Sequence, residues 1–438
     1  MSPTSRGPDP VESPIAEGGS IAYTRSPLEV VLAKGPFRAT LTMLGPAFVA
    51  AIAYVDPGNF ATNIQGGAKF GYLLLWVVLA ANLMAMLIQY LSAKLGIVSE
   101  RNLPEAFRDR YPRWASWGMW VQAEVISMST DIAEFLGAAL GLNLLFHVPL
   151  FVAGVMTGFM AFGILELRQH GFRRFELAIT ALLGLIFLGF LYETLKIGPS
   201  ASAAVESFLP PKLGGASALY LAVGIIGATV MPHAIYLHSA LTQGRMPVRD
   251  DAERARVLRF ERTDVIVALG LAGLINLSML AVAAKLFHGS GLTGVATIPG
   301  AHTAFSHLVG GGAALAFAVA LLASGASSSS VGTYAGQVVM GGFLNLNISL
   351  YVRRIVTMIP ALVVLAIGVS PTSALVLSQV VLSFGIPFAL IPLVLLTNRR
   401  DVMGVHVNRP LTAYTAWALV ALITGLNVFL LVQAAGLG

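Results

Sequence analysis

The chain has 438 residues, of which 56% are hydrophobic and only 11% are charged. Soluble domains carry about 25% charged residues, so this composition excludes a water-soluble globular fold. The absence of cysteine excludes disulfides, thiolate-bound metals and iron–sulfur clusters. A net charge of +6 could attract nucleic acid, but the distribution of the basic residues described below argues against that partner.

The N-terminal segment differs in composition from the rest of the chain. It is rich in Pro, Ser and Gly and lacks the apolar core of a signal peptide, so we expect residues 1–38 to form a disordered cytoplasmic tail. From residue 39 onward the apolar residues fall into separate runs of about 20, each able to cross a ~30 Å hydrocarbon core as a helix. The short alternating segments of a membrane β-barrel are absent from the sequence. The expected fold is therefore an all-α integral membrane protein, with about eleven transmembrane helices in one domain, 39–438.

The predicted spans lie near 40–66, 71–97, 114–142, 149–167, 175–197, 217–241, 264–287, 313–341, 353–369, 372–396 and 411–436. Their connections divide the basic residues unevenly. The sequence has 27 Lys and Arg residues. If the N-terminus is inside, only four of them lie outside: Lys69, Lys196, Lys212 and Lys285. This asymmetry follows the positive-inside rule and supports the span count. The basic residues then face anionic lipid of the inner leaflet, and nucleic acid is not an expected partner.

Two spans are interrupted at matching places. The first breaks at 56–59 (Asp-Pro-Gly-Asn) and the sixth at 231–233 (Met-Pro-His), each in mid-span. Because the breaks are five spans apart, the sixth span must cross in the direction opposite to the first. Paired breaks in oppositely oriented halves are typical of an inverted-repeat transporter with a midplane site, although a proline alone can simply kink a helix. We expect repeat one over 39–200, repeat two over 213–397 and an extra helix over 411–436.

Each break frees a backbone carbonyl. Proline has no N–H, so Pro57 leaves the carbonyl of Ala53 without its helical partner. Pro232 does the same for the carbonyl of Ala228. Both oxygens end half-helices whose negative dipole ends point into the gap, where they can bind a cation.

Side chains beside these carbonyls complete a candidate metal site. They are the Asp56 carboxylate, which would cost about 2.5–3.5 kcal/mol near the bilayer centre, the Asn59 amide oxygen and the Met231 thioether. Together these groups fit a six-coordinate divalent cation. Gln379 of span ten is a candidate sixth ligand, or it forms a helix–helix hydrogen bond. The thioether favours Mn²⁺, Fe²⁺, Co²⁺ and Cd²⁺ over Mg²⁺ and Ca²⁺, although methionine also commonly fills gaps in a core.

Span three carries a second polar set. Glu124, Asp131 and Glu134 lie within about 60° of one another on one helix face. Three carboxylates on one face of a membrane helix indicate either a proton-carrying path or a structural ion-pair network. Arg353 and Arg354, at the start of span nine, are the candidate counterions.

Two histidines of span six have different expected roles. His233 lies beside the second break and, with a pKa that is normally near neutral, is a candidate proton carrier. His238 is five residues further on, roughly 140° around the helix, so it need not share that path. We expect His238 to be an interior histidine with satisfied hydrogen bonds.

The residues at the two breaks resemble those of the Nramp family of proton-coupled divalent metal transporters, specifically the bacterial MntH-type manganese transporters. A third segment, 332–337 (Gly-Thr-Tyr-Ala-Gly-Gln), matches the transport signature of that family, and we expect it to enter the loop between spans eight and nine. The resemblance runs from about residue 40 to the C-terminus. The chain departs from the family pattern at 326–330 (Ala-Ser-Ser-Ser-Ser) and at Gly341, and we expect both departures to lie away from the site.

The resemblance implies a LeuT-like fold and the import of Mn²⁺ or Fe²⁺, and also of Cd²⁺ and Co²⁺, with protons by alternating access. It implies a multi-pass protein of the bacterial inner membrane with a cytoplasmic N-terminus, no bound cofactor and no obligate protein partner. The implied metal ligands are Asp56, Asn59, Met231 and the carbonyls of Ala53 and Ala228, with Gln379 as a candidate. The implied proton pathway comprises Asp56, His233, Asp131, Glu134 and Glu124, with Arg353 and Arg354 as partners.

Other classes of function fit the sequence less well. The main alternative is a cation-coupled symporter of a small organic solute on the same fold, but Asp56 would repel a substrate carboxylate at the first break. A channel would need rings of repeated carbonyls or charges along a pore. An intramembrane enzyme would need a nucleophile–base pair or a HExxH motif, and an ATP-driven pump a phosphate-binding loop; the sequence shows neither. We therefore expect a transporter and not an enzyme.

Overall fold

The computed structural model describes residues 26–169, 171–208, 214–292, 294–346 and 348–435, and every regular element in these ranges is helical. In chain order the elements are α1 (Pro27–Leu32), α2 (Pro36–Met43), α3 (Pro46–Ala51), η1 (Ile52–Val55), α4 (Pro57–Phe70), η2 (Gly71–Leu74), α5 (Leu75–Ser99), α6 (Leu103–Arg108), α7 (Arg113–Phe146), α8 (Leu150–Gln169), α9 (Phe172–Ile197), α10 (Ala201–Glu206), α11 (Ala216–Thr229), α12 (Pro232–Thr242), α13 (Asp251–Phe287), α14 (Ile298–Leu308), α15 (Gly311–Leu344), α16 (Leu350–Ala366), α17 (Pro371–Thr397), α18 (Arg400–Met403), η3 (Gly404–His406) and α19 (Pro410–Ala434).

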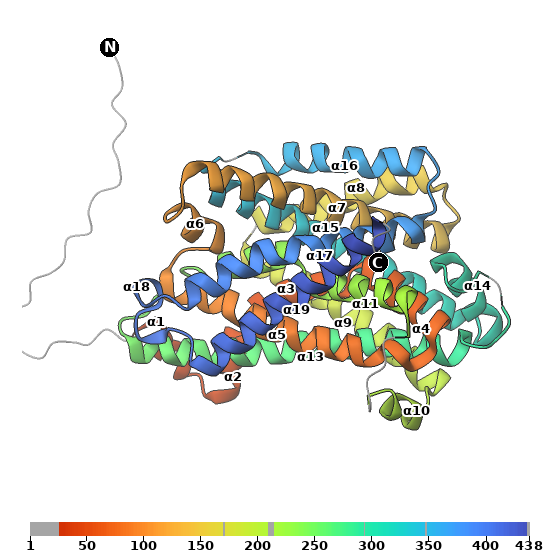
Figure 1. The fold of residues 1–438 in the computed structure, drawn as a ribbon, viewed down its shortest axis with the longest axis horizontal. Coiled ribbons are helices and arrows are strands. Elements are labelled where there is room, and N and C mark those ends of the chain that lie inside the picture. The colour runs from red at the N-terminus through yellow and green to blue at the C-terminus, as the bar shows by residue number, and fades with distance from the viewer. Residues whose placement is uncertain (1–25, 170, 209–213, 293, 347, 436–438) are drawn as a thin grey trace, which may run out of the picture.

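The long helices run mostly along one axis of the molecule (Figure 1). α8 and α16 lie along one side of the bundle, and α13 lies along the other. The short helices α1, α2, α6 and α18 gather at one end, whereas α10 and α14 gather at the opposite end. This arrangement leaves the broken helices α3, α4, α11 and α12 inside the bundle.

The number of spans can be compared with the prediction of about eleven. Eight described helical stretches are long and apolar enough to cross a membrane, or nine if the bent pair formed by α2 with α3 and η1 counts as one span. One of the eight, Pro57–Ser99, joins α4 to α5 through η2. The predicted count also includes α8, whose described apolar stretch is the shorter Leu150–Ile164, and α16, which has 17 residues. The predicted class, an all-α membrane protein with many spans, is confirmed.

Both predicted interruptions are present. The 3-10 helix η1 ends at Val55, Asp56 is extended (φ −76°, ψ 168°), and α4 begins at Pro57. In the sixth span α11 ends at Thr229, and Met231 is the extended residue before α12. In both cases proline occupies the first position of the second half-helix, where a missing N–H costs nothing and the fixed φ suits a helix.

The first span also has a bend that the sequence did not predict. α2 and the segment formed by α3 and η1 meet at an angle of 47°. Between them, the N–H groups of Gly45 and Ala47 donate to Asp264 Oδ2 of α13 at 3.1 and 3.0 Å. A side chain at residue 45 would place its Cβ 2.7 Å from Glu176 Oε1 of α9. The Asp264 carboxylate of span seven therefore holds this bend, and the Glu176 carboxylate of span five packs against it.

The predicted tail boundary is wrong for residues 26–38. Residues 1–25 lie outside the described residues, but α1 and the start of α2 fall within the expected disordered segment. A capping box starts α1, because Ser26 and Glu29 each accept a hydrogen bond from the backbone N–H of the other. Leu28 is fully buried in an apolar cluster with residues of α2, α5 and α13. Local capping and this burial together order the segment.

Candidate metal-binding site

The two breaks meet inside the bundle. Asp56 Oδ1 accepts hydrogen bonds from the backbone N–H and the side-chain Nδ2 of Asn59, both at 2.8 Å. The same Asn59 Nδ2 donates to the carbonyl of Ala228, in the other break, at 2.9 Å. Asp56, Asn59 and Ala228 are all buried. A carboxylate, an amide and a freed carbonyl from distant parts of the sequence thus form one hydrogen-bonded cluster.

Gln379 of α17 joins this cluster from a third side. Its Nε2 donates to Asp56 Oδ2 at 3.3 Å, while its Oε1 has no hydrogen-bond partner among the described residues. α17 can lie this close because glycines face it. A Cβ on Gly58 would collide with the side-chain amide of Gln379, and a Cβ on Gly227 would collide with the backbone carbonyl of Gln379. The expected helix–helix hydrogen bond is present, and a role for Gln379 as a metal ligand stays a prediction.

The two remaining predicted ligands lie in the same breaks. Met231 is fully buried and occupies the N-cap position of α12, where no side chain caps the helix. Ala53 is buried in η1, three residues before Asp56. Their roles as metal ligands stay predictions, as does the freed state of the Ala53 carbonyl.

Polar residues that the sequence analysis missed hold the carbonyl end of the first break. Asn276 Nδ2 of α13 donates to the Tyr54 carbonyl at 2.7 Å, and Ser324 Oγ of α15 donates to the Val55 carbonyl at 2.6 Å. These bonds satisfy two carbonyls that η1 leaves open. The available signal was a polar residue in the middle of an otherwise apolar span.

A second polar chain runs from the first break toward the far end of α12. Gln89 of α5 donates to the Tyr54 hydroxyl and lies 2.9 Å, through Oε1, from His238 Nδ1. His238 Nε2 in turn lies 2.9 Å from Glu261 Oε1 of α13. Both nitrogens of this fully buried histidine therefore face a polar partner. The prediction that His238 is an interior histidine is confirmed, but its hydrogen bonds are satisfied at Nδ1 only, because Nε2 forms none with a described residue.

The carboxylates of α7 meet the predicted arginines. Arg353 Nη2 lies 2.7 Å from Glu124 Oε1, and Arg354 Nη1 lies 3.2 Å from Asp131 Oδ1. Arg354 is fully buried and its guanidinium lies 5.1 Å from the ring centroid of Phe135. The two predicted ion pairs thus join α7 to α16 beneath the protein surface.

Glu134, the third carboxylate of α7, differs from the other two because no described Lys or Arg forms an ion pair with it. It is fully buried and packs against α15, where a Cβ on Gly332 would lie 2.8 Å from Glu134 Oε2. On α7 it lies three residues, close to one helical turn, after Asp131. Glu134 is thus a buried carboxylate beside the ion pairs of α7, and its role in the proton pathway stays a prediction.

His233 provides another contact between α7 and the second break. Its Nδ1 lies 3.4 Å from Thr130 Oγ1 of α7, and its Nε2 has no hydrogen-bond partner among the described residues. α7 also touches the first break, because a Cβ on Gly137 would collide with the ring of Pro57. Thr130 is a further residue that the sequence analysis missed, since a threonine in a membrane helix commonly bonds only its own backbone.

Two expectations about α15 are wrong. The serine-rich segment 326–330 was expected away from the site, but Arg354 donates to Ser329 and, at 3.3 Å, to Thr333 Oγ1. The signature segment 332–337 was expected to enter a loop, but α15 continues as a helix to Leu344. Small Ser, Gly and Ala side chains let α7 pack closely on this helix and do not end it inside the membrane.

Two helices broken in mid-span, in halves of opposite orientation, with polar groups converging where they break, define an inverted-repeat secondary transporter. The fold is shared with Mhp1, a nucleobase-cation-symport-1 family transporter in a closed conformation, at a TM-score of 0.58 and 16% identity over 89% of this chain and 87% of that one. The prediction of a LeuT-like fold is confirmed at the level of the fold.

The chain belongs to the Nramp family: the sequence model described as "Natural resistance-associated macrophage protein-like" matches residues 47–433. It is 51% identical to the divalent metal cation transporter MntH of Deinococcus radiodurans, over 98% of this chain and 97% of the relative. It is also 51% identical to MntH of Bacillus subtilis, over 91% and 93% of the two chains. A solved structure of the manganese transporter of Eremococcus coleocola, in complex with an aromatic bis-isothiourea substituted compound, has a TM-score of 0.83 and 34% identity over 90% and 86%.

Proposed function

We propose that this chain imports divalent transition-metal ions, Mn²⁺ or Fe²⁺ and also Cd²⁺ and Co²⁺, together with protons by alternating access. The observation that carries the proposal is the buried cluster in which Asp56, Asn59 and the Ala228 carbonyl converge from both breaks. The family supports it, because relatives about half identical to this chain are named divalent metal cation transporters.

The metal is the cargo, and the cluster is its binding site. A single carboxylate, Asp56, supplies charge, while amide and carbonyl oxygens supply neutral ligands that release a divalent ion more easily than a cage of carboxylates would. The proposed ligands are Asp56, Asn59, Met231, the carbonyls of Ala53 and Ala228, and Gln379. The soft thioether of Met231 distinguishes this set from an all-oxygen site.

Binding of the metal requires one local rearrangement. Asn59 Nδ2 now donates to Asp56 Oδ1 and to the Ala228 carbonyl, so an N–H group lies where a cation would. A half-turn about the terminal torsion of Asn59, which has a broad and nearly two-fold profile, exchanges Nδ2 for Oδ1. Three oxygens then face a common point. The Asn59 amide thereby serves as a hydrogen-bond donor without the metal and as a ligand with it.

The proton route runs from the break along α7. Asp56 is the group that meets both metal and proton, His233 follows the second break at the start of α12, and Glu134 is a buried carboxylate that forms no ion pair with a described Lys or Arg. Along the same face of α7, the proposed route continues from Glu134 to Asp131 and Glu124. Arg354 and Arg353 hold those two carboxylates in place and balance their charge.

The proposed location is the bacterial inner membrane, with the N-terminus in the cytoplasm and the basic loops against anionic lipid. The chain has no cysteine, so single cysteines report topology directly. Ser290→Cys, beyond α13, should react with an impermeant thiol reagent applied to intact cells, whereas Ala255→Cys, near the start of α13, should react only after permeabilisation. The reverse labelling pattern would overturn the orientation.

Uptake into proteoliposomes tests the proposed function. We expect Mn²⁺ to enter, to enter faster when the external solution is more acidic, and to acidify the lumen as it does so. Ca²⁺ at the same concentration should enter far more slowly. The absence of Mn²⁺ uptake would contradict the proposal, and proton-driven uptake of an organic solute would support the alternative symporter.

A further inference from the structure

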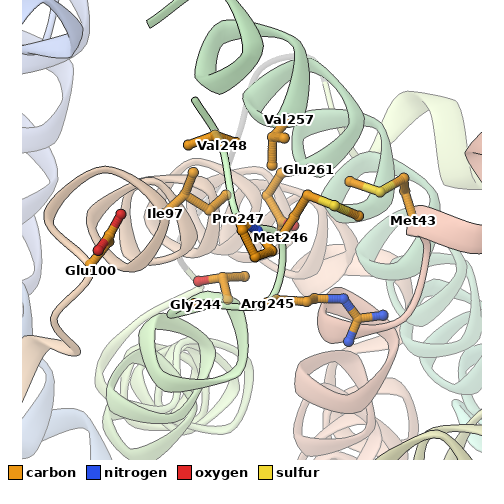
Figure 2. Close-up of a pocket in the computed structure, with 11 residues that line it drawn as sticks. Met43, Ile97, Glu100, Gly244, Arg245, Met246, Pro247, Val248, Val257 and Glu261 are labelled. Carbon is orange, nitrogen blue, oxygen red and sulfur yellow. The ribbon is translucent and has the colours of Figure 1, made fainter. Parts of the chain in front are cut away.

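A cavity of about 220 Å³ lies at the end of the bundle where α2, α5 and α12 finish and α13 begins. Its lining includes Met43, Glu100, Arg245, Met246 and Glu261, all labelled in Figure 2. Under the orientation proposed above, this end faces the cytoplasm. α12, which runs from the second break to the cavity wall, has 11 residues and spans about 16 Å. The cavity therefore lies one half-helix below the cluster at the breaks.

The cavity gathers soft and hard metal ligands. Met43 is the last residue of α2 and Met246 lies in the loop after α12, and the two belong to one packed cluster of side chains. Glu261 brings a carboxylate that is only 6% exposed, and Glu100 brings an exposed one. Arg245, the one cation in the lining, is occupied elsewhere because it forms an ion pair with Glu176.

Glu261 is the group that points to a ligand. One of its oxygens, Oε1, lies 2.9 Å from His238 Nε2 but forms no hydrogen bond with any described residue. A buried carboxylate is costly unless a positive charge or several donors compensate it. A cation held in the cavity would supply this compensation.

We propose that this cavity is a second, weaker site for a soft divalent cation, with the thioethers of Met43 and Met246 and the carboxylate of Glu261 as ligands. It holds the metal after it leaves the breaks and before it enters the cytoplasm. The proposal rests on the proposed function for the direction of transport, but the binding itself does not depend on transport. The combination of thioether and carboxylate selects the same class of ion as Asp56 with Met231.

Metal binding to the purified full-length chain tests the site, with Cd²⁺ as the probe. The double variant Asp56→Ala/Met231→Ala removes the charged and the soft ligand at the breaks. We expect calorimetry to show two bound Cd²⁺ ions per wild-type chain and one per double variant. Adding Met246→Leu, which keeps the side-chain volume, should weaken the remaining site about tenfold, and adding Glu261→Gln should weaken it at least as much.

A matched control and a spectroscopic measurement keep folding defects apart from ligand loss. Met160→Leu changes a partly buried methionine on α8, far from the cavity in the sequence, and should leave Cd²⁺ binding unchanged. Because the chain has no cysteine, any sulfur seen around bound Cd²⁺ by X-ray absorption must belong to methionine. The double variant should show sulfur neighbours, and Met246→Leu should remove part of that signal.

Two results would overturn this site. One is a double variant that binds no Cd²⁺, and the other is bound Cd²⁺ that has only oxygen neighbours and ignores both cavity substitutions. In either case Mn²⁺ uptake by the wild-type chain would still support the proposed function. Conversely, a chain that binds Cd²⁺ in the cavity but transports no metal would contradict the proposed function alone.

Discussion

The cluster at the breaks and the ion pairs along α7 are adjacent but built on opposite principles. At the breaks one carboxylate, Asp56, is surrounded by neutral amides and carbonyls. Along α7 the carboxylates Glu124 and Asp131 are each matched by an arginine of α16. The first region has one charge and several ligands that can change partners, whereas the second has fixed and mutually balanced charges.

This difference suggests that the breaks bind the metal, whereas the carboxylates of α7 carry the proton. A site that must release its ion cannot contain a permanent counterion, because an arginine would exclude the cation. A proton path needs carboxylates that stay in place in a medium of low dielectric constant, and arginines provide that. Glu134, which forms no ion pair with a described Lys or Arg, follows Asp131 on the same helix face and is the candidate link between the two regions.

The largest effect is expected at Asp56. Asp56→Asn keeps a good N-cap for α4, because asparagine caps helices as well as aspartate does, but it removes the charge. Bound Mn²⁺ and the Asp56 carboxylate form a buried pair of opposite charges, and removing one member of such a pair costs about 3 kcal/mol or more. Mn²⁺ uptake should therefore fall at least about a hundredfold. Uptake and thermal melting of the same preparation check this. Near-normal uptake by a folded Asp56→Asn chain would mean that Asp56 acts as a cap only.

A smaller and more selective effect is expected along α7. Asp131→Asn and Glu134→Gln should each lower proton flux by about tenfold and leave the dissociation constant for Mn²⁺ within about twofold. The reason is that neither side chain belongs to the cluster at the breaks. Lumenal pH and Mn²⁺ binding are measured on the same variants. Unchanged proton flux would favour the alternative that these ion pairs only join helices.

Met231 should affect selectivity more than rate. Met231→Ala should keep appreciable Mn²⁺ uptake, because water can replace the thioether around this ion, while Cd²⁺ affinity should fall about tenfold, or about 1.4 kcal/mol. Ca²⁺ should begin to compete with Mn²⁺, since the ligand that disfavours hard ions is gone. Calorimetry with Cd²⁺ and uptake competition with Ca²⁺ measure both. If neither changes, Met231 only fills space.

The smallest effect is expected at the contact between the two regions. The 3.4 Å separation of Thr130 Oγ1 from His233 Nδ1 is long for a hydrogen bond, so its loss in Thr130→Val should cost about 0.5 kcal/mol. Proton flux should fall by roughly twofold, with Mn²⁺ affinity unchanged. A much larger loss of proton flux would show that this contact, and not Glu134, couples the two regions.

The sequence predicted features that depend on local chemistry. Proline and its neighbours located both breaks, and the spacing of charges located the α7 face and its arginines on α16. It failed where the outcome depended on tertiary packing. The bend at Gly45 follows from Asp264 of a distant span, and the order of α1 follows from burial of Leu28. Likewise, nothing local distinguishes Ser329, which bonds Arg354, from the serines beside it.

Gly58 and Gly227, the glycines that face Gln379, set how closely Gln379 and α17 can lie to the two breaks. A Cβ on residue 227 would lie 2.0 Å from the Gln379 backbone oxygen and push α17 away, whereas a Cβ on residue 58 would displace the Gln379 side chain. The oxygen ligands of Mg²⁺ and Ca²⁺ differ in distance by only about 0.3–0.5 Å. Relieving either contact takes a shift of about 1 Å, which is larger than this difference, so the two glycines help to set the position of the proposed ligand Gln379. Selection among metal ions by size therefore depends on how closely α17 approaches the two broken helices, as well as on the chemistry of the ligands.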